Sequence, residues 1–182
     1  MKNMPLNKNE AIQKREKIMI KETDKILDIM EIVEEYNVTE KEKNIYKKLE
    51  PLIIYTKVTD FEGYIIETEQ EYIFFGITSG QQCCEYFGYL MCGDGQKEIE
   101  SFIGAEFLSL ECTDKNLLKT ELFLKENYMH EDEVMFIDIN TNKGTLQFTA
   151  YNQHNGKYGH KVMVFSYKKE TAEKKYHVDI TI

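Results

Sequence analysis

The spacing of apolar residues changes near Pro51, and this change limits the folds that the chain can adopt. Before Pro51, apolar residues recur at intervals close to one helical turn. After it, they alternate with polar residues in runs rich in Ile, Val, Tyr, Phe and Thr. A period near 3.6 is typical of amphipathic helices, and a period near 2 is typical of half-buried strands. The pattern predicts an α+β protein, with a helical segment over residues 1–50 and an antiparallel β-rich domain over residues 51–182.

Two helices are expected before Pro51. The range Asn9–Tyr36 carries four apolar residues at seven-residue spacing, which predicts a long amphipathic helix. They are Ile12, Met19, Ile26 and Val33. Thr39 and Glu42 form a capping box that starts a second, shorter helix. A seven-residue stripe can pair with a second copy of itself, so a homodimer through the long helix is the alternative to packing within the chain.

The remainder of the chain is expected to form a strongly bent antiparallel sheet. Two Asn-Gly-type turns, at Asn142–Gly144 and Asn155–Gly156, indicate hairpins, and a short helix is expected between Gln96 and Ile103, ended by Gly104. The predicted strands are Leu52–Thr59, Tyr64–Thr68, Tyr72–Thr78, Glu85–Met91, Glu106–Cys112, Val134–Ile139, Thr145–Tyr151, His160–Tyr167 and Tyr176–Ile182.

The net charge of −9 lies entirely after residue 50, and residues 60–114 contain 12 acidic residues against one lysine. Such a field repels phosphate, so direct binding of nucleic acid through residues 60–114 is disfavoured and a basic protein partner is favoured. The alternative is that the acidity only keeps the protein soluble. Strand alternation predicts that Glu67, Glu69 and Glu71 share one face, and these residues with Glu85 are candidate partner contacts.

No run of 18 apolar residues and no apolar leader core occurs in the sequence, so we expect no membrane span and a location in the cytoplasm of a bacterial host cell. The four cysteines are Cys83, Cys84, Cys92 and Cys112. Free buried thiols are favoured over disulfides in such a chain, and the spacing of the cysteines does not indicate a zinc site. We therefore expect no metal and no cofactor.

A nucleophilic cysteine is one candidate for chemistry, because Cys83 and Cys84 follow a glycine and His154 or His160 could act as the base. The acidic surroundings oppose formation of a thiolate, so a structural thiol is favoured. The chain also lacks a phosphate-binding glycine loop, a G-x-S-x-G motif and an H-E-x-x-H motif. We therefore expect a binding protein and not an enzyme.

The segment from Tyr151 to His160 is the second candidate, since it gathers amides, imidazoles, tyrosines and glycines between two apolar runs. Loops held by rigid strands are common places for binding residues. The alternative is that Asn155 and Gly156 only close a hairpin and that the histidines fill space. The candidate contacts in this segment are Tyr151, Asn152, His154, Asn155, Tyr158 and His160.

Three sequence blocks carry a family resemblance. SGQQCCEYFGYL at Ser79–Leu90, IGAEFLSLECTD at Ile103–Asp114 and FTAYNQHNGKYGHKVMV at Phe148–Val164 resemble a family of small uncharacterised proteins of phages and mobile elements. With its N-terminal addition, the whole chain resembles type II-A anti-CRISPR proteins of Firmicute mobile elements.

The resemblance implies an inhibitor that binds the single-protein, RNA-guided nuclease of type II CRISPR systems, with or without its guide RNA, and blocks cleavage of target DNA. It brings no catalytic residues. The nucleic-acid channels of such nucleases are lined with Lys and Arg, which suits an acidic ligand. A protein that binds or sequesters a small ligand and a cryptic cysteine hydrolase are the alternatives.

Overall fold

The structure is a computed structural model, and it describes residues 24–33, 35–53, 56–80, 86–93, 99–113, 125, 134–153 and 158–182. The strands are β1 (Asp24–Glu31), β2 (Phe61–Thr68), β3 (Glu71–Thr78), β4 (Tyr86–Gly93), β5 (Glu106–Thr113), β6 (Val134–Thr141), β7 (Gly144–Gln153), β8 (Lys161–Lys168) and β9 (Lys174–Thr181). The helical elements are α2 (Glu40–Leu49) and four short 3-10 turns, η1 (Glu35–Asn37), η2 (Glu50–Leu52), η3 (Val58–Asp60) and η4 (Ile99–Phe102).

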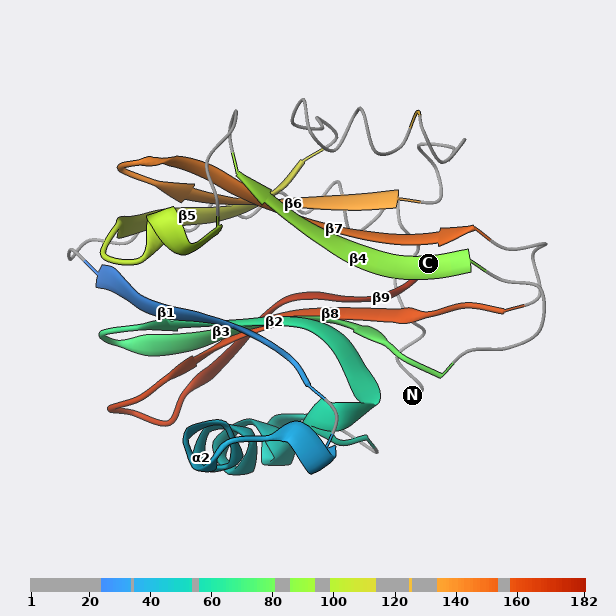
Figure 1. Ribbon diagram of the computed structural model, residues 1–182, viewed down its shortest axis with the longest axis horizontal. Coiled ribbons are helices and arrows are strands. Elements are labelled where there is room, and N and C mark those ends of the chain that lie inside the picture. Colours follow the sequence, from blue (N-terminus) through green and yellow to red (C-terminus); the bar gives the residue numbers. More distant parts are fainter. Residues whose placement is uncertain are drawn as a thin grey trace, which may run out of the picture.

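The strands form two packed layers. Their hydrogen-bonded order is β4-β7-β6-β5-β1-β2-β3-β8-β9, and every neighbouring pair is antiparallel. In Figure 1 the first four strands of this order make the upper layer, and β2, β3, β8 and β9 lie with most of β1 in the lower layer. Asp24 and Lys25 of β1 pair with β5, whereas the rest of β1 pairs with β2. β1 therefore joins the two layers.

Two apolar cores follow from this arrangement. The main core lies between the layers and includes Phe75 and Phe148, whose rings are 5.5 Å apart. The second core lies between the lower layer and α2, where Leu49 of α2 belongs to the same buried cluster as Phe74 and Phe165. Because the lower layer is covered on both faces, residues 72–77 of β3 are all buried. Such continuous burial is expected of a strand that lies between two cores.

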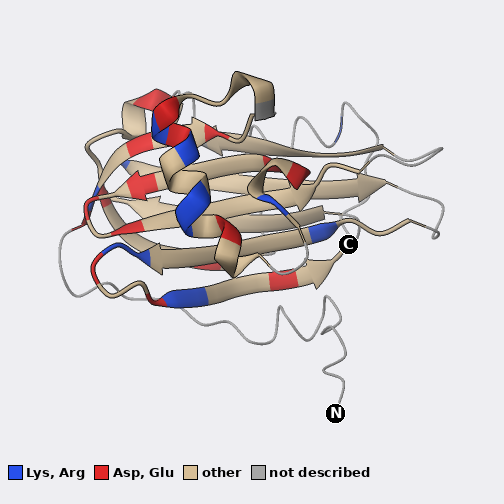
Figure 2. Cartoon of the chain, turned by 90° about the horizontal axis from the view of Figure 1, so that it is seen from below, with Lys and Arg blue, Asp and Glu red and all other residues tan. Residues whose placement is uncertain are grey.

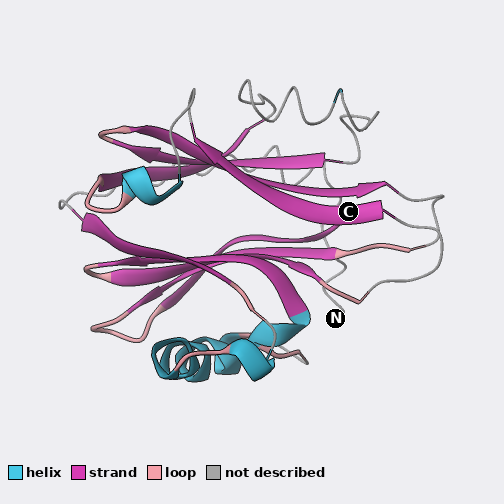
Figure 3. Cartoon of the chain, in the orientation of Figure 1, coloured by secondary structure: helices cyan, strands magenta, loops and turns pink. Residues whose placement is uncertain are grey.

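The α+β prediction is wrong, because the chain is mostly β (Figure 3). The long helix predicted over Asn9–Tyr36 is contradicted by β1, and residues 9–23 lie outside the described part of the chain. Ile26 lies in the main core as a strand residue, so the seven-residue stripe does not form a helical face there. The homodimer through this helix, which was the alternative to packing within the chain, is not tested by the described residues.

Some of the other local predictions are confirmed and others are wrong. The second helix is confirmed as α2, including the capping box between Thr39 and Glu42. The strand predicted over Leu52–Thr59 is wrong, because η2 and η3 occupy its two ends. The other eight predicted strands are confirmed as β2 to β9, with shifted ends. Of the helix predicted before Gly104, the described part is only η4.

The turn at residues 142–143 joins β6 to β7 as predicted, whereas Asn155 and Gly156 lie outside the described residues. No helix in the described ranges is both long and apolar enough to cross a membrane.

Candidate binding site

The candidate residues that the structure describes fall into two groups, toward opposite ends of the β2–β3 hairpin. β2 runs from Phe61 to Thr68 and β3 returns to Thr78, so the ends of this hairpin are separated by roughly 25 Å. We call the turn of this hairpin, with the residues around Glu67, the charged end. The opposite end, with Thr78, Phe87, Asn152 and His160, is called the aromatic end. Figure 2 shows that acidic and basic residues gather mostly toward one end of the strands.

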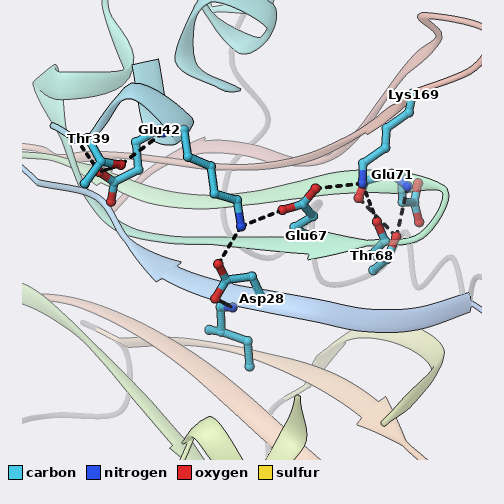
Figure 4. Close-up of polar contacts among 9 residues, drawn as sticks. Asp28, Thr39, Glu42, Glu67, Thr68, Glu71 and Lys169 are labelled. Carbon is cyan, nitrogen blue, oxygen red and sulfur yellow. Dashed lines mark hydrogen bonds and ion pairs between the residues drawn. The ribbon is translucent and has the colours of Figure 1, made fainter. Parts of the chain in front are cut away.

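Lysines at the charged end pair with the carboxylate of Glu67 on the face that α2 covers. Lys41 Nζ of α2 lies 2.6 Å from Asp28 Oδ2 and 2.9 Å from Glu67 Oε2, and Lys169 Nζ lies 2.9 Å from Glu67 Oε1 (Figure 4). Burial opposes ionisation of Glu67, but the hydrogen bonds from Lys169 and Lys41 outweigh it and hold its pKa below the usual value. This carboxylate fastens α2 and the β8–β9 turn to the sheet.

The other face of the charged end holds a buried carboxylate. Asp24 is 1% exposed, and it accepts hydrogen bonds from Thr68 Oγ1 at 2.7 Å and from the Gln70 amide at 3.0 Å. Burial raises the pKa of Glu71, with a smaller contribution from the charge of Asp24, although a hydrogen bond with Ser166 opposes the shift. Asp24 therefore holds the start of β1 against the β2–β3 turn.

The prediction that Glu67, Glu69 and Glu71 share one face is wrong. A two-residue turn at Glu69 and Gln70 separates β2 from β3, so the three residues do not follow one strand. Glu67 faces α2, Glu69 is exposed in the turn, and Glu71 is half-buried toward the other face. Glu85 lies outside the described residues.

The aromatic end is built by pairing between strands that are distant in sequence. β4 pairs with β7 so that Phe87 lies opposite Asn152. The ring of Phe87 stacks on His160, with centroids 3.7 Å apart. His160 Nδ1 lies 2.6 Å from the Thr78 carbonyl oxygen. Because a carbonyl oxygen can only accept, Nδ1 carries the proton, and this fixes the ring orientation.

Asn152 is the most constrained polar residue at this end. Its Nδ2 donates to the Tyr158 carbonyl at 3.0 Å and to the Ile182 carbonyl at 2.9 Å. Its Oδ1 is buried and has no hydrogen-bond partner within the described part of the chain. Buried polar atoms are nearly always hydrogen-bonded, so an acceptor without a partner requires an explanation.

Tyr151 points to the opposite face of β7, because successive residues of a strand alternate. Its ring packs against Tyr86, with centroids 5.6 Å apart. A Cβ at Gly88 would lie only 2.6 Å from the Tyr151 hydroxyl, so a larger residue at position 88 would require this ring to shift. His154 and Asn155 lie outside the described residues.

The structure therefore brings Asn152, Tyr158 and His160 together and separates them from Tyr151. Sequence reasoning missed Phe87 and Thr78. Phe87 lies within the block Ser79–Leu90, which carries part of the family resemblance, but the strand register that places it on His160 cannot be read from one sequence.

The described residues offer little for catalysis. They contain no group of three His, Cys, Asp or Glu residues that could hold a metal ion. Burial raises the pKa of the Cys112 thiol to about 11, which disfavours the reactive thiolate, and Cys92 is buried. Cys83 and Cys84 lie outside the described ranges.

Comparisons with known proteins give one match. No curated protein and no solved structure is significantly similar to the chain. A family model described as a domain of unknown function, DUF7448, matches residues 42–164, which include most of α2 and the aromatic-end residues Thr78, Phe87, Asn152 and His160. This match covers more than half of the sequence, and the chain belongs to the DUF7448 family.

Proposed function

We propose that the chain is a non-enzymatic inhibitor that binds the single-protein, RNA-guided nuclease of type II CRISPR systems in the cytoplasm of a bacterial cell. One observation supports this more than any other. Two of the three blocks that carry the resemblance, Ser79–Leu90 and Phe148–Val164, are far apart in sequence but meet at the aromatic end, where Phe87 stacks on His160. Segments that share a binding role are expected to converge in this way.

Charge also favours a basic target. The chain carries −9, and the nucleic-acid channels of these nucleases are rich in Lys and Arg. The charged end is a weak candidate for the contact, since lysines of the chain itself already pair with Glu67. We therefore place the contact at the aromatic end.

The test is a DNA-cleavage assay with purified nuclease, guide RNA and target DNA, in which the concentration of the chain is varied. Inhibition is expected at concentrations near that of the nuclease. A pull-down with and without guide RNA then shows which form of the nuclease is bound. Full cleavage at a large excess of the chain would contradict the proposal.

Two tyrosine variants locate the contact. Tyr86 at the aromatic end is 48% exposed, and Tyr36 in η1 is 80% exposed. Exposed aromatic residues are frequent energetic centres of protein interfaces. Tyr86→Ala is expected to weaken inhibition by about tenfold, as loss of a central interface aromatic typically does, whereas Tyr36→Ala is expected to leave it unchanged. Equal losses of inhibition for the two variants would contradict the assignment of the nuclease contact to the aromatic end.

A small bound molecule is the second candidate, favoured by Oδ1 of Asn152, which has no hydrogen-bond partner among the described residues. A ligand with an N–H or O–H group would satisfy this acceptor. Native mass spectrometry of the purified protein is expected to show an added mass that is lost on denaturation. A mass equal to that of the polypeptide alone would leave a bound water as the explanation.

A further inference from the structure

The nine-stranded order ends in two edge strands, β9 and β4, and they differ in how they are protected. Edge strands expose unpaired backbone groups to which other chains can add, and proteins usually protect them with lysines and bulges. β9 has both protections. It begins with Lys174 and Lys175, and His177 is an extra residue where its register against β8 shifts.

β4 has neither protection. Its eight residues, YFGYLMCG, carry no charge and no proline, and all eight pair with β7 without a register shift. In Figure 1 β4 is drawn in front of β6 and β7. An uncharged edge of this length with an uninterrupted register is a template for the addition of another strand.

The hairpin between β6 and β7 shows which groups of β4 are unpaired. A two-residue turn makes Thr141 and Gly144 a hydrogen-bonded pair, so the even-numbered residues of β7 bond to β6. The odd-numbered residues of β7 therefore bond to β4, and their partners there include Gly88 and Leu90. The N–H and C=O groups of Phe87, Tyr89 and Met91 point away from β7. Within the described ranges these groups make no backbone hydrogen bond outside the sheet ladders.

The carboxylates that act on Tyr89 in this strand are Glu31 and Glu62. The Tyr89 hydroxyl donates a hydrogen bond to Glu31 of β1. Burial raises the pKa of Tyr89, and the hydrogen bond and charge of Glu31 and the charge of Glu62 raise it further. Glu31 also acts on the neighbouring Tyr64, whose ring lies 5.6 Å from that of Tyr89. A negative field along an unpaired strand edge favours a basic occupant.

We propose that the unpaired edge of β4 is a docking site for an extended, positively charged segment of another protein, which joins the sheet as an additional strand beside Phe87, Tyr89 and Met91. The backbone bonds supply affinity, and the carboxylates beside the edge select basic side chains. The inference goes beyond the proposed function, because it specifies a mode of binding that does not require the nuclease.

The test uses an acetylated and amidated octapeptide of alternating Lys and Val. Amide hydrogen exchange followed by NMR is expected to slow by at least about tenfold at Phe87, Tyr89 and Met91 when the peptide is saturating. Gly88 and Leu90 are internal controls, because their amides are already hydrogen-bonded to β7. Absence of slowing at the three outward amides, or slowing along β9 instead, would overturn the inference.

A pair of variants at Leu90 tests the charge selection. Leu90 points away from the main core and is half-buried, so Leu90→Lys and Leu90→Glu lose the same apolar contacts but add opposite charges. Leu90→Lys is expected to weaken peptide binding by about tenfold relative to Leu90→Glu at low salt, since like charges repel across an interface. Equal peptide affinities of the two variants would contradict the proposal that the occupant is basic. Slow exchange at the three amides without peptide, increasing with protein concentration, would identify a second copy of this chain as the occupant instead.

Discussion

The charged end and the aromatic end of the molecule satisfy their polar groups in different ways. At the charged end, Glu67 and Asp24 have partners contributed by other elements of the chain. At the aromatic end the buried groups are His160 and Asn152, and Oδ1 of Asn152 has no hydrogen-bond partner in the ranges that the structure describes. The difference teaches that acidic composition alone does not locate a binding surface, because carboxylates can be used within the fold.

Among the substitutions proposed here, the largest loss of stability is expected at Asp24. Asp24→Ala leaves the Thr68 hydroxyl and the Gln70 amide without their acceptor and is expected to lower the free energy of unfolding by about 3 kcal/mol. Asp24→Asn keeps an oxygen acceptor and is expected to lose less. Urea denaturation measures both. A loss at Asp24→Ala no greater than that at Asp24→Asn would show that the carboxylate does not hold the turn.

A smaller effect is expected at His160. His160→Ala removes the stack on Phe87 and the hydrogen bond to Thr78, and is expected to cost about 2 kcal/mol. His160→Phe keeps a ring beside Phe87 and is expected to recover part of the loss. If His160→Ala is as stable as the parent in urea, the stack does not contribute to the fold.

Glu67 and Glu71 are expected to act with opposite signs at neutral pH. The pKa of Glu67 is lowered, so its ionised form stabilises the fold above the unfolded pKa, and this is lost as the pH falls through the folded pKa. The pKa of Glu71 is raised, so its ionisation costs stability as the pH rises through the folded pKa. At pH 7, Glu67→Gln is expected to lower stability by about 1 kcal/mol, and Glu71→Gln to raise it slightly.

The check is a series of melting temperatures between pH 3 and pH 8, a window that extends to both sides of the ordinary glutamate pKa. The difference between Glu67→Gln and the parent is expected to shrink toward low pH. If the melting temperature of Glu67→Gln equals that of the parent at every pH, the lysine partners of Glu67 contribute nothing to the stability of the fold.

The smallest effect is expected at the ion pair between Lys43 and Glu40, which is exposed on α2. Solvent screens such pairs, so Lys43→Gln is expected to leave the melting temperature unchanged. Lys41→Gln is the comparison, because Lys41 bridges Asp28 and the largely buried Glu67. Equal shifts for the two variants would indicate that the network at the charged end is no stronger than a surface pair.

Sequence patterns located the strands after Pro51 but missed β1 for a physical reason. A register shift between Ile26 and Asp28 adds one residue to β1, so that Ile26 and Ile29 both contact the main core at a spacing of three. That spacing resembles one helical turn, and the seven-residue recurrence strengthened the wrong interpretation. A bulge of this kind cannot be distinguished from a helix by periodicity alone.

The candidate sites were predicted in part. The segment ending at His160 was singled out because of its composition, and Asn152, Tyr158 and His160 do lie together. Phe87 and Thr78 reach them only through strand pairing across more than 60 residues, which local patterns do not encode. The acidic trio was misjudged because the face alternation was continued through a turn at Glu69 and Gln70.

The position of β1 has a consequence for synthesis on the ribosome. β1 is the first described strand to emerge, but its partner β5 follows about 80 residues later, which at 5–20 residues per second is roughly 4–16 seconds. During that interval Ile26, which is fully buried in the finished protein, cannot reach the part of the core that β5 supplies. The nascent chain is therefore expected to need a chaperone, or early pairing of β1 with β2, to avoid aggregation before the upper layer is complete.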